Sequence, residues 1–246
     1  MNKNSNSYIF IYASVMVVLV AVILTSANLA LKPLQDKNKE NEKMINLLSS
    51  IGIDADASNA SELYSKHLKK EVIINENGEE LSTYANGELT GSKRAFGVNL
   101  KTALYNASKG EVAMPLFVMD NDGETFYVIP LFGKGLWGPI YGNISIESDK
   151  NTVAAVNFGH DSETPGLGAE IILPAFTDEF KNKQIFKDGE FKSVSVVKGG
   201  VDMQTKVAEE NGVDAISGST LTCDGVTNML HDCMINYVNY LKQEDK

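Results

Sequence analysis

The sequence predicts an α+β protein, in which a single N-terminal transmembrane helix precedes a mostly antiparallel sheet with flanking helices. Three observations support this fold class. The chain carries no charged residue between Asn4 and Leu31. Apolar runs of strand length are separated by Asn77-Gly78 and Asp122-Gly123, which are typical hairpin dipeptides. Near the C-terminus, residues 224–242 place apolar side chains at helical spacing.

The first apolar segment, residues 8–31, is long enough to cross a membrane. As a helix it would extend roughly 36 Å, and a bilayer core needs roughly 30 Å. It is longer than the apolar part of a secretory signal, and no A-x-A-like cleavage site is seen, so we expect a retained anchor over residues 1–32. Positive charges alone would place the following body in the cytoplasm, because Lys3 precedes the segment and four lysines follow it, namely Lys32, Lys37, Lys39 and Lys43.

Residues 33–110 predict a stalk and an intervening segment of helices and strands. The charged run from Pro33 to Ser50 carries spaced apolar residues, which predicts an amphipathic helix that ends before Gly52. Asn59 and Glu62 are three residues apart, which suggests a capping box for a short helix through Lys70. The pattern then changes to strands.

Beyond this segment we expect more strands and two helices. Residues 174–183 predict the first helix. The second, residues 224–242, has one apolar face formed by Val226, Leu230, Cys233, Tyr237 and Leu241. The strands of the whole body are expected at residues 72–74, 114–119, 124–132, 140–147, 152–158 and 191–197.

Composition and cysteine usage exclude several classes of protein. The net charge of −10 argues against a nucleic-acid partner, since phosphates require a positive field. Cys223 and Cys233 would lie about 15 Å apart on one helix, and a disulfide needs Cα atoms closer than about 7 Å. Two cysteines without matching histidines also make a poor metal site. We therefore expect neither a disulfide nor a bound metal.

The most informative motif is Ser217-Gly218-Ser219-Thr220-Leu221-Thr222, which places hydroxyls at a loop-to-helix junction. Such a junction presents free backbone N–H groups and the positive end of a helix dipole, so it favours a phosphate. The alternative is a hydroxyl-rich N-cap that serves only the helix behind it.

Two glycine-rich segments accompany this motif. Residues 133–142 contain four glycines and the only tryptophan, Trp137, and residues 163–170 read Glu-Thr-Pro-Gly-Leu-Gly-Ala-Glu. Glycine lets the backbone approach a bound ring closely, and an aromatic side chain can form a pocket wall. The alternatives are a glycine-rich turn with a core tryptophan and a surface turn without a ligand.

Together these three motifs resemble the C subunit of the sodium-translocating NADH:quinone reductase, a family with a covalent FMN-binding domain. The hydroxyl motif resembles the S/T-G-A-T-x-T/S signature of that family, with Ser219 where alanine is usual. The G subunit of the Rnf electron-transport complex shares this motif and the E-T-P-G-L-G loop. The Gly135-Leu136-Trp137 stretch and the long segment after the anchor favour the quinone reductase.

The resemblance implies a set of cofactor-binding residues within an FMN-binding domain at residues 111–246. Thr222 would carry one FMN through a phosphoester, and Ser219 and Thr220 would hold the phosphate. It implies no catalytic residue and no metal. The remaining cofactor-binding positions are Leu136, Trp137, Glu163, Thr164, Gly166, Leu167 and Gly168.

The implied function is electron relay within a membrane complex that pumps sodium and reduces a quinone with electrons from NADH. No G-x-G-x-x-G segment follows a strand, so this chain would not oxidise NADH itself. The implied partners are the other proteins of the complex, a flavin transferase and membrane lipid. The implied location is the bacterial inner membrane, with one span and the FMN domain on the periplasmic side. A non-redox extracytoplasmic binding protein is the alternative from another class.

Overall fold

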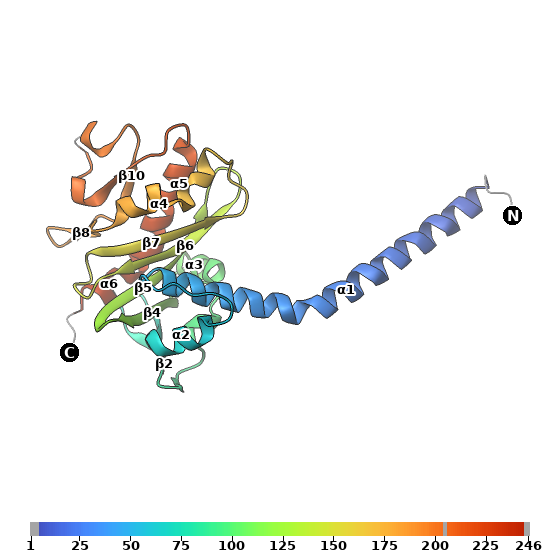
Figure 1. Ribbon diagram of the computed structural model, residues 1–246, viewed down its shortest axis with the longest axis horizontal. Coiled ribbons are helices and arrows are strands. Elements are labelled where there is room, and N and C mark those ends of the chain that lie inside the picture. Colours follow the sequence, from blue (N-terminus) through green and yellow to red (C-terminus); the bar gives the residue numbers. More distant parts are fainter. Residues whose placement is uncertain (1–4, 204–205, 244–246) are drawn as a thin grey trace. The chain divides into compact units, whose positions relative to one another are not determined.

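The computed structural model describes residues 5–203 and 206–243, so Lys3 and the extreme ends of the predicted anchor and FMN domain lie outside the described residues. The chain divides into two compact units, Met1–Lys43 and Met44–Lys246. Figure 1 shows the elements of both units. The second unit contains every strand of the described residues and all the predicted cofactor contacts.

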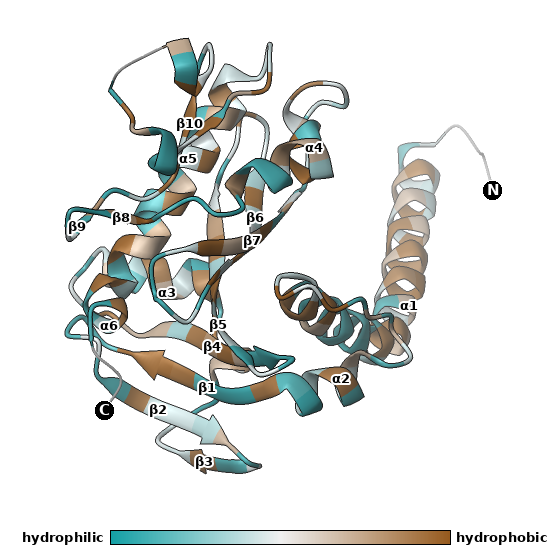
Figure 2. Cartoon of the chain, turned by 60° about the vertical axis from the view of Figure 1, so that its left-hand side comes forward, coloured by the Kyte–Doolittle hydropathy of each residue, from teal (hydrophilic) through white to brown (hydrophobic). Residues whose placement is uncertain are grey.

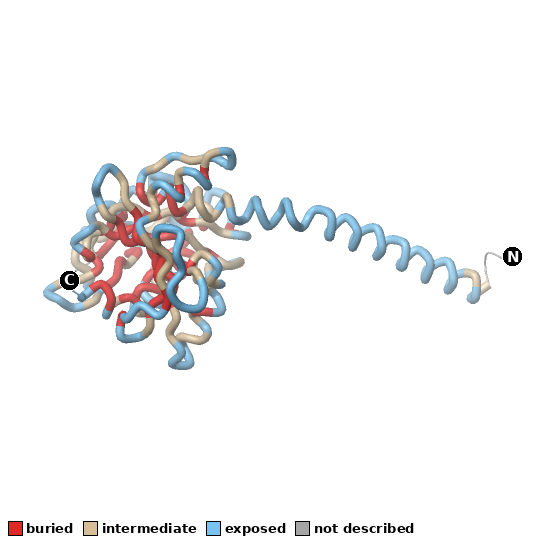
Figure 3. Tube along the Cα trace, turned by 90° about the horizontal axis from the view of Figure 1, so that it is seen from below, coloured by how far each residue is buried: buried red, intermediate tan, exposed pale blue. Residues whose placement is uncertain are grey.

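The first helix, α1, spans Asn6–Ser49 and continues through Pro33 (Figure 1). The first half of this helix is mostly apolar (Figure 2), and its residues 9–40 are exposed (Figure 3). Among the described residues it is the one helix long and apolar enough to cross a membrane, by length and composition. The anchor and the amphipathic helix were expected as separate elements. They form one helix because good helix formers flank Pro33 on both sides and offset its missing N–H.

A seven-stranded antiparallel sheet forms the centre of the second unit, with strand order β3-β2-β1-β4-β5-β6-β7. Strands β4 to β7 follow one another as a meander, and β1 to β3 extend the sheet beyond β4. The predicted mostly antiparallel sheet is confirmed. The strands are β1 Leu68–Ile74, β2 Glu80–Ala85, β3 Glu88–Thr90, β4 Met114–Asn121, β5 Glu124–Lys134, β6 Pro139–Ile146 and β7 Val153–His160.

Both predicted hairpin turns are present. Asp122 and Gly123 connect β4 to β5 with φ angles of 52° and 86°, the two positive values of a type I′ turn. The Asn77-Gly78 turn connects β1 to β2, where Asn75 Oδ1 accepts hydrogen bonds from Asn77 N–H at 3.0 Å and Glu79 N–H at 2.9 Å. These local turns set the register of the strands beside them.

The buried core lies around the sheet, as the red interior of Figure 3 shows. Successive residues of a strand point to opposite faces, so Ile129 and Val128 belong to different clusters. Ile129 joins a cluster with Leu230 of helix α5, which spans Thr220–Met234. Val128 joins a cluster with Leu47 at the end of α1. The sheet is thus covered on both faces.

The short helices differ from the sequence prediction in several places. Helix α2 is Ala60–His67, and β1 begins at Leu68, so the helix ends before Lys70. The capping box is wrong, because Asn59 makes no capping bond and its Oδ1 accepts from Asp56 N–H at 2.8 Å. Helix α3, Leu100–Ala107, was not expected. The helix predicted at 174–183 is shorter, with α4 at Pro174–Thr177 and a 3₁₀ turn at Asp178–Phe180.

The C-terminal half also corrects the expected boundaries. Ser193, with φ of 61°, interrupts the strand predicted at 191–197. The chain instead forms β8 Phe186–Lys187 paired with β9 Glu190–Phe191, and β10 Ser195–Val197 parallel to β11 Gly212–Asp214.

Helix α5 starts at Thr220 and not at Asp224, so the hydroxyl motif enters its first turn. A 3₁₀ turn, Ile235–Tyr237, and helix α6, Val238–Leu241, follow it. All five side chains of the predicted apolar face are buried, and both cysteines are free and buried. Burial raises the pKa of the Cys233 thiol to about 12.

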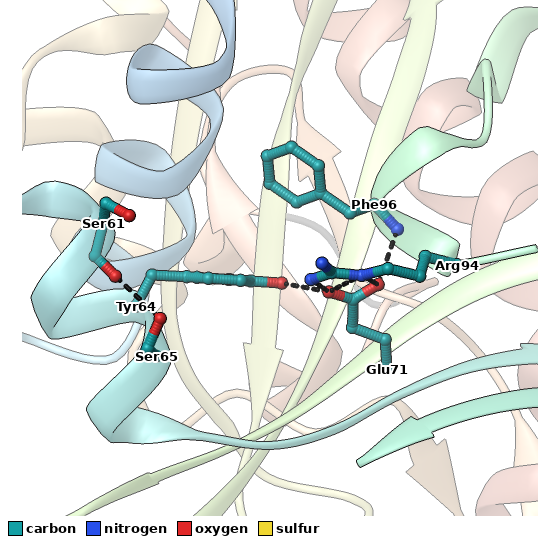
Figure 4. A network of polar contacts seen from close by, with 6 residues as sticks. All are labelled: Ser61, Tyr64, Ser65, Glu71, Arg94 and Phe96. Atoms are coloured by element: carbon teal, nitrogen blue, oxygen red, sulfur yellow. Dashed lines mark hydrogen bonds and ion pairs between the residues drawn. The ribbon is translucent and has the colours of Figure 1, made fainter. Parts of the chain in front are cut away.

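A buried carboxylate, that of Glu71 on β1, connects three elements of this unit (Figure 4). The Tyr64 hydroxyl of α2 donates to it at 3.0 Å, and the Phe96 N–H donates at 2.9 Å. Arg94 donates from Nε at 3.2 Å and forms an ion pair through Nη2. Burial, and then the charge of Glu71, raise the pKa of Tyr64 well above its usual value. The network joins α2 and the 94–96 turn to the sheet.

We predict that Glu71→Gln destabilises the protein by about 2 to 3 kcal/mol, because it removes a buried charge on which Arg94 and two other donors converge. Denaturant unfolding of the full chain measures this loss. Glu80→Gln removes the partly exposed pair with Lys70 and should cost about 0.5 kcal/mol. Equal losses for the two variants would contradict the role given to the Glu71 network.

Candidate functional site

The candidate site lies where three segments meet at one end of the sheet. They are the turn between β5 and β6 at residues 135–138, the loop after β7 at residues 161–167, and the first turn of α5 (Figure 1). The β5–β6 hairpin carries the first segment because its strands pair through Lys134 and Pro139. The sheet therefore holds the two glycine-rich motifs beside the hydroxyl motif.

One carboxylate, that of Glu163, joins all three segments. The Thr222 hydroxyl donates a hydrogen bond to Glu163 Oε2 at 2.7 Å. Glu163 Oε1 accepts from the Trp137 N–H at 2.9 Å and from the Gly138 N–H at 3.4 Å. Both partners of the side-chain bond are buried, Glu163 with 4% and Thr222 with 2% of its surface exposed. The contact fixes the position of the Thr222 oxygen.

The environment of Glu163 favours its ionised form. Burial by itself raises the pKa of the Glu163 carboxyl, but the hydrogen bonds from Thr222, Trp137 and Gly138 and the charge of His160 outweigh it. The net pKa lies below its ordinary value of 4.5. Because the folded value is lowered, the stability it contributes is present above the unfolded pKa and is lost as the pH falls through the folded pKa.

Two glycines leave room for this contact. A Cβ atom on Gly168 would lie 2.5 Å from Thr222 Oγ1 and 2.6 Å from Glu163 Oε2. A Cβ atom on Gly135 would lie 2.5 Å from Glu163 Oε1. A side chain at either position would therefore displace the carboxylate or the hydroxyl, which explains in physical terms why glycine occupies both positions.

The first turn of α5 is suited to an anion. Ser219 stands at the N-cap but makes no side-chain capping bond, which is contrary to the interpretation of the motif as the helix's own cap. Its Oγ is buried and, among the described residues, has no hydrogen-bond partner. Free N–H groups and the helix dipole at this end attract negative charge. A phosphate would satisfy the Ser219 hydroxyl.

Large apolar side chains are exposed around the same site. Trp137 exposes 67% of its surface, Leu136 45% and Leu167 41%. The alternative of a core tryptophan is therefore wrong. Exposed apolar groups of this size, gathered at the end of a sheet, are typical of a surface that contacts a ligand, another protein or a membrane.

The other predicted contacts belong to the same loop or to α5. Thr164 shapes the loop, because its carbonyl accepts from the Leu167 and Ala169 N–H groups, each at 3.1 Å. Gly166 N–H donates to Glu170 Oε1 at 2.9 Å. Thr220 is half-buried as the first residue of α5. The structure thus brings the ten predicted positions to one end of the sheet, and their contacts with a cofactor stay predictions.

Sequence reasoning missed two features of this site. It did not foresee the bond between Thr222 and Glu163, whose positions are separated by 59 residues. It also favoured a solvated turn for His160, whose Nδ1 accepts the Glu163 N–H at 3.3 Å. No local sequence signal reports the Thr222–Glu163 contact, because it forms only when α5 packs against the end of the sheet, whereas the His160–Glu163 contact spans three residues. Among the described residues, no three metal-binding side chains are grouped as a metal site.

Comparison with known proteins adds independent evidence. The family model described as the FMN-binding domain matches residues 135–235, which include the β5–β6 turn, the Glu163 loop and α5. The chain resembles the C subunit of the Na(+)-translocating NADH-quinone reductase of Vibrio alginolyticus, with 30% identity over 84% of this chain and 81% of that protein. The same protein of Haemophilus ducreyi is 30% identical over 92% of this chain and 89% of that protein.

Solved structures show the same architecture. The crystal structure of the C subunit from Parabacteroides distasonis matches with a TM-score of 0.75 and 40% identity, over 87% of this chain and 98% of that chain. The Shewanella oneidensis NqrC structure matches with a TM-score of 0.64 and 27% identity, over 83% and 99%. Similarity of this extent in both sequence and fold confirms the resemblance drawn from the motifs: the chain belongs to the family of C subunits of the Na(+)-translocating NADH-quinone reductase.

Proposed function

We propose that this chain is an electron-transfer flavoprotein subunit of a sodium-translocating NADH:quinone reductase, and that it carries one FMN as a phosphoester on Thr222. Its family and its FMN-binding domain support the flavin cofactor and the electron-transfer role. The proposal adds the attachment to a threonine and the assignment of residues to the phosphate, the ribityl chain and the ring.

The single observation that carries this proposal is the arrangement at the start of α5. A threonine hydroxyl is held at 2.7 Å from a carboxylate, in the first turn of a helix whose N-cap serine has an unsatisfied, buried hydroxyl. A helix N-terminus stabilises a phosphate, and exposed Trp137 and Leu167 offer apolar surface to a ring. The phosphate of a flavin attached here would lie at the helix N-terminus, and its ring would lie against Trp137 and Leu167.

Bound FMN supplies chemistry that no amino-acid side chain offers, the transfer of one or two electrons. The residues of this chain bind and orient it. Ser219, Thr220 and the first N–H groups of α5 would hold the phosphate. Leu136, Trp137, Leu167 and the glycines of the loop would contact the ring and the ribityl chain. Because Leu136, Trp137 and Leu167 are exposed, the ring would lie at the surface, where the redox centre of a neighbouring protein can approach.

The burial of Thr222 bears on how the flavin is attached. With 2% of its surface exposed, the hydroxyl is covered by the Glu163 loop, and Gly168 lies directly against it. A flavin transferase would therefore reach Thr222 Oγ1 when the segment at Gly168 moves aside and the hydrogen bond to Glu163 is kept.

The family and the single apolar helix support an inner-membrane protein that assembles with other subunits. We propose that one span anchors the chain in membrane lipid and that the FMN domain lies on the periplasmic side. The lysines after the span favour the cytoplasm by number alone. We give more weight to the family, since a few juxtamembrane charges set orientation weakly in comparison with an extended sequence match.

We predict that Thr222→Ala abolishes covalent flavin, because it removes the oxygen that would be esterified. The full-length chain is co-expressed with a flavin transferase, and its intact mass and peptide masses are recorded. Thr222→Ser keeps the hydroxyl and should keep part of the label, while Leu221→Ala, an exposed neighbour with no assigned contact, should retain it. Covalent flavin on Thr222→Ala would contradict the assignment. An unmodified wild-type chain would favour the non-redox binding protein.

We predict that substitutions at the exposed rim change the flavin's reduction potential and leave its attachment intact. Leu167→Arg should raise the potential, because a nearby positive charge stabilises the reduced anion, and Leu167→Glu should lower it. Trp137→Ala should shift it by about 40 mV, equivalent to about 1 kcal/mol of lost aromatic contact. Redox titration of the purified chain measures these shifts.

Leu81 on β2 exposes 52% of its surface and lies far along the chain from the site, so Leu81→Arg is the matched control. Its potential should equal that of the wild type. Wild-type potentials in Leu167→Arg, Leu167→Glu and Trp137→Ala would remove the ring contacts from Trp137 and Leu167.

A further inference from the structure

We propose that Glu163 is a catalytic residue that this chain contributes to its own flavin attachment, by accepting the proton of the Thr222 hydroxyl as the phosphoester forms. This inference rests on the proposed attachment at Thr222. The protein that is modified would thus take part in forming the phosphoester, together with the transferase.

The geometry points to Glu163 because its Oε2 already accepts the hydrogen bond of the reacting hydroxyl. The 2.7 Å distance between Thr222 Oγ1 and Glu163 Oε2 lies within the range needed for direct proton transfer. The second oxygen is held by the Trp137 and Gly138 N–H groups, so the carboxylate has a fixed orientation. No rearrangement of Glu163 is needed before the proton moves.

The charge state of Glu163 suits this role. Its pKa lies below its ordinary value, because the hydrogen bonds it accepts outweigh the effect of burial, so it is an anion at neutral pH. A carboxylate is a weak base, but phosphoryl transfer passes through a loose transition state in which little base strength is required. The catalytic aspartate of protein kinases accepts a substrate hydroxyl proton in the same way.

The step balances if the flavin arrives as an activated phosphoanhydride, as in flavin adenine dinucleotide. Thr222 Oγ1 forms a bond to the phosphorus that bears the riboflavin moiety, and the bond from that phosphorus to the bridging oxygen of the pyrophosphate breaks. Adenosine monophosphate leaves with the bridging oxygen. The hydroxyl proton goes to Glu163 Oε2, and no electron is gained or lost.

The neighbouring titratable groups are less suited to accept this proton. His160 Nδ1 is engaged by the Glu163 N–H. The Cys223 thiol has its pKa raised by burial, which disfavours the thiolate. The other titratable residues nearest in the chain to the three segments of the site are Lys134 on β5, Asp161 after β7, Glu170 in the loop and Asp224 on α5. None of them is hydrogen-bonded to Thr222 in the described residues.

The test measures the rate at which purified, full-length, unmodified chain gains flavin from flavin adenine dinucleotide and a flavin transferase. Glu163→Gln should slow labelling about 100-fold or more, the usual contribution of a general base. Gly168→Ala should also slow it, because the added Cβ separates Thr222 from Glu163 without removing the carboxylate. Thermal unfolding of each variant shows whether the fold is retained.

Glu71→Gln is the matched control, since it neutralises another fully buried glutamate away from Thr222. It should label at the wild-type rate per folded chain even though it is less stable. Wild-type labelling by Glu163→Gln would overturn this inference alone. A wild-type chain that gains no label, or a Thr222→Ala chain that does, would overturn the attachment to Thr222 and this inference with it.

The pH dependence separates proton acceptance from positioning. The ratio of wild-type to Glu163→Gln rates cancels the titration of the transferase. If Glu163 accepts the proton, hydroxide replaces it progressively in the variant, and the ratio should fall about tenfold per pH unit between about pH 6 and pH 9. A ratio that is constant over this range would mean that Glu163 only positions Thr222, which overturns the proposal.

Discussion

The site depends on the hydrogen bonds of one buried carboxylate. Glu163 receives the Thr222 hydroxyl on one oxygen and two backbone N–H groups on the other, and these donors come from α5 and from the β5–β6 turn. A buried charge without donors would cost several kcal/mol, so the three segments must stay together to keep it satisfied. Glycine is needed at positions 135 and 168 for the same reason, because a side chain at either position would collide with the Glu163 carboxylate or with the hydroxyl that donates to it.

The unit contains a second buried carboxylate, Glu71, whose surroundings differ from those of Glu163. Glu71 is neutralised by Arg94 and sits within the network of α2 and the sheet. Among the described residues, Glu163 has no lysine or arginine partner, and its donors are neutral apart from the influence of His160. Glu163 therefore keeps its negative charge beside the Thr222 hydroxyl, whereas the charge of Glu71 is compensated by Arg94.

The sequence predicted those features that depend on residues close together in the chain, and it missed contacts between residues far apart in the chain. The apolar span, the two hairpin dipeptides and the apolar face of the last helix are local patterns, and the structure confirms them. The start of α5 was misplaced by four residues, because hydroxyl residues have similar preferences for a cap and for a first turn. The expected cap at Asn59 failed because its side chain bonds to Asp56 instead. The contact between Thr222 and Glu163 could not be predicted, since it exists only after α5 has packed against the end of the sheet.

If Thr222 carries the flavin, as proposed above, the cover over its hydroxyl would make maturation depend on folding. Once this cover has closed, the hydroxyl would react only during brief openings of the segment at Gly168, so the observed rate would be the chemical rate multiplied by the open fraction. An opening that costs about 2.7 kcal/mol would leave about one molecule in a hundred accessible at any moment. A chain that receives its cofactor before closure avoids this delay. The order of loading and closing therefore decides how long a newly made protein remains without its electron carrier.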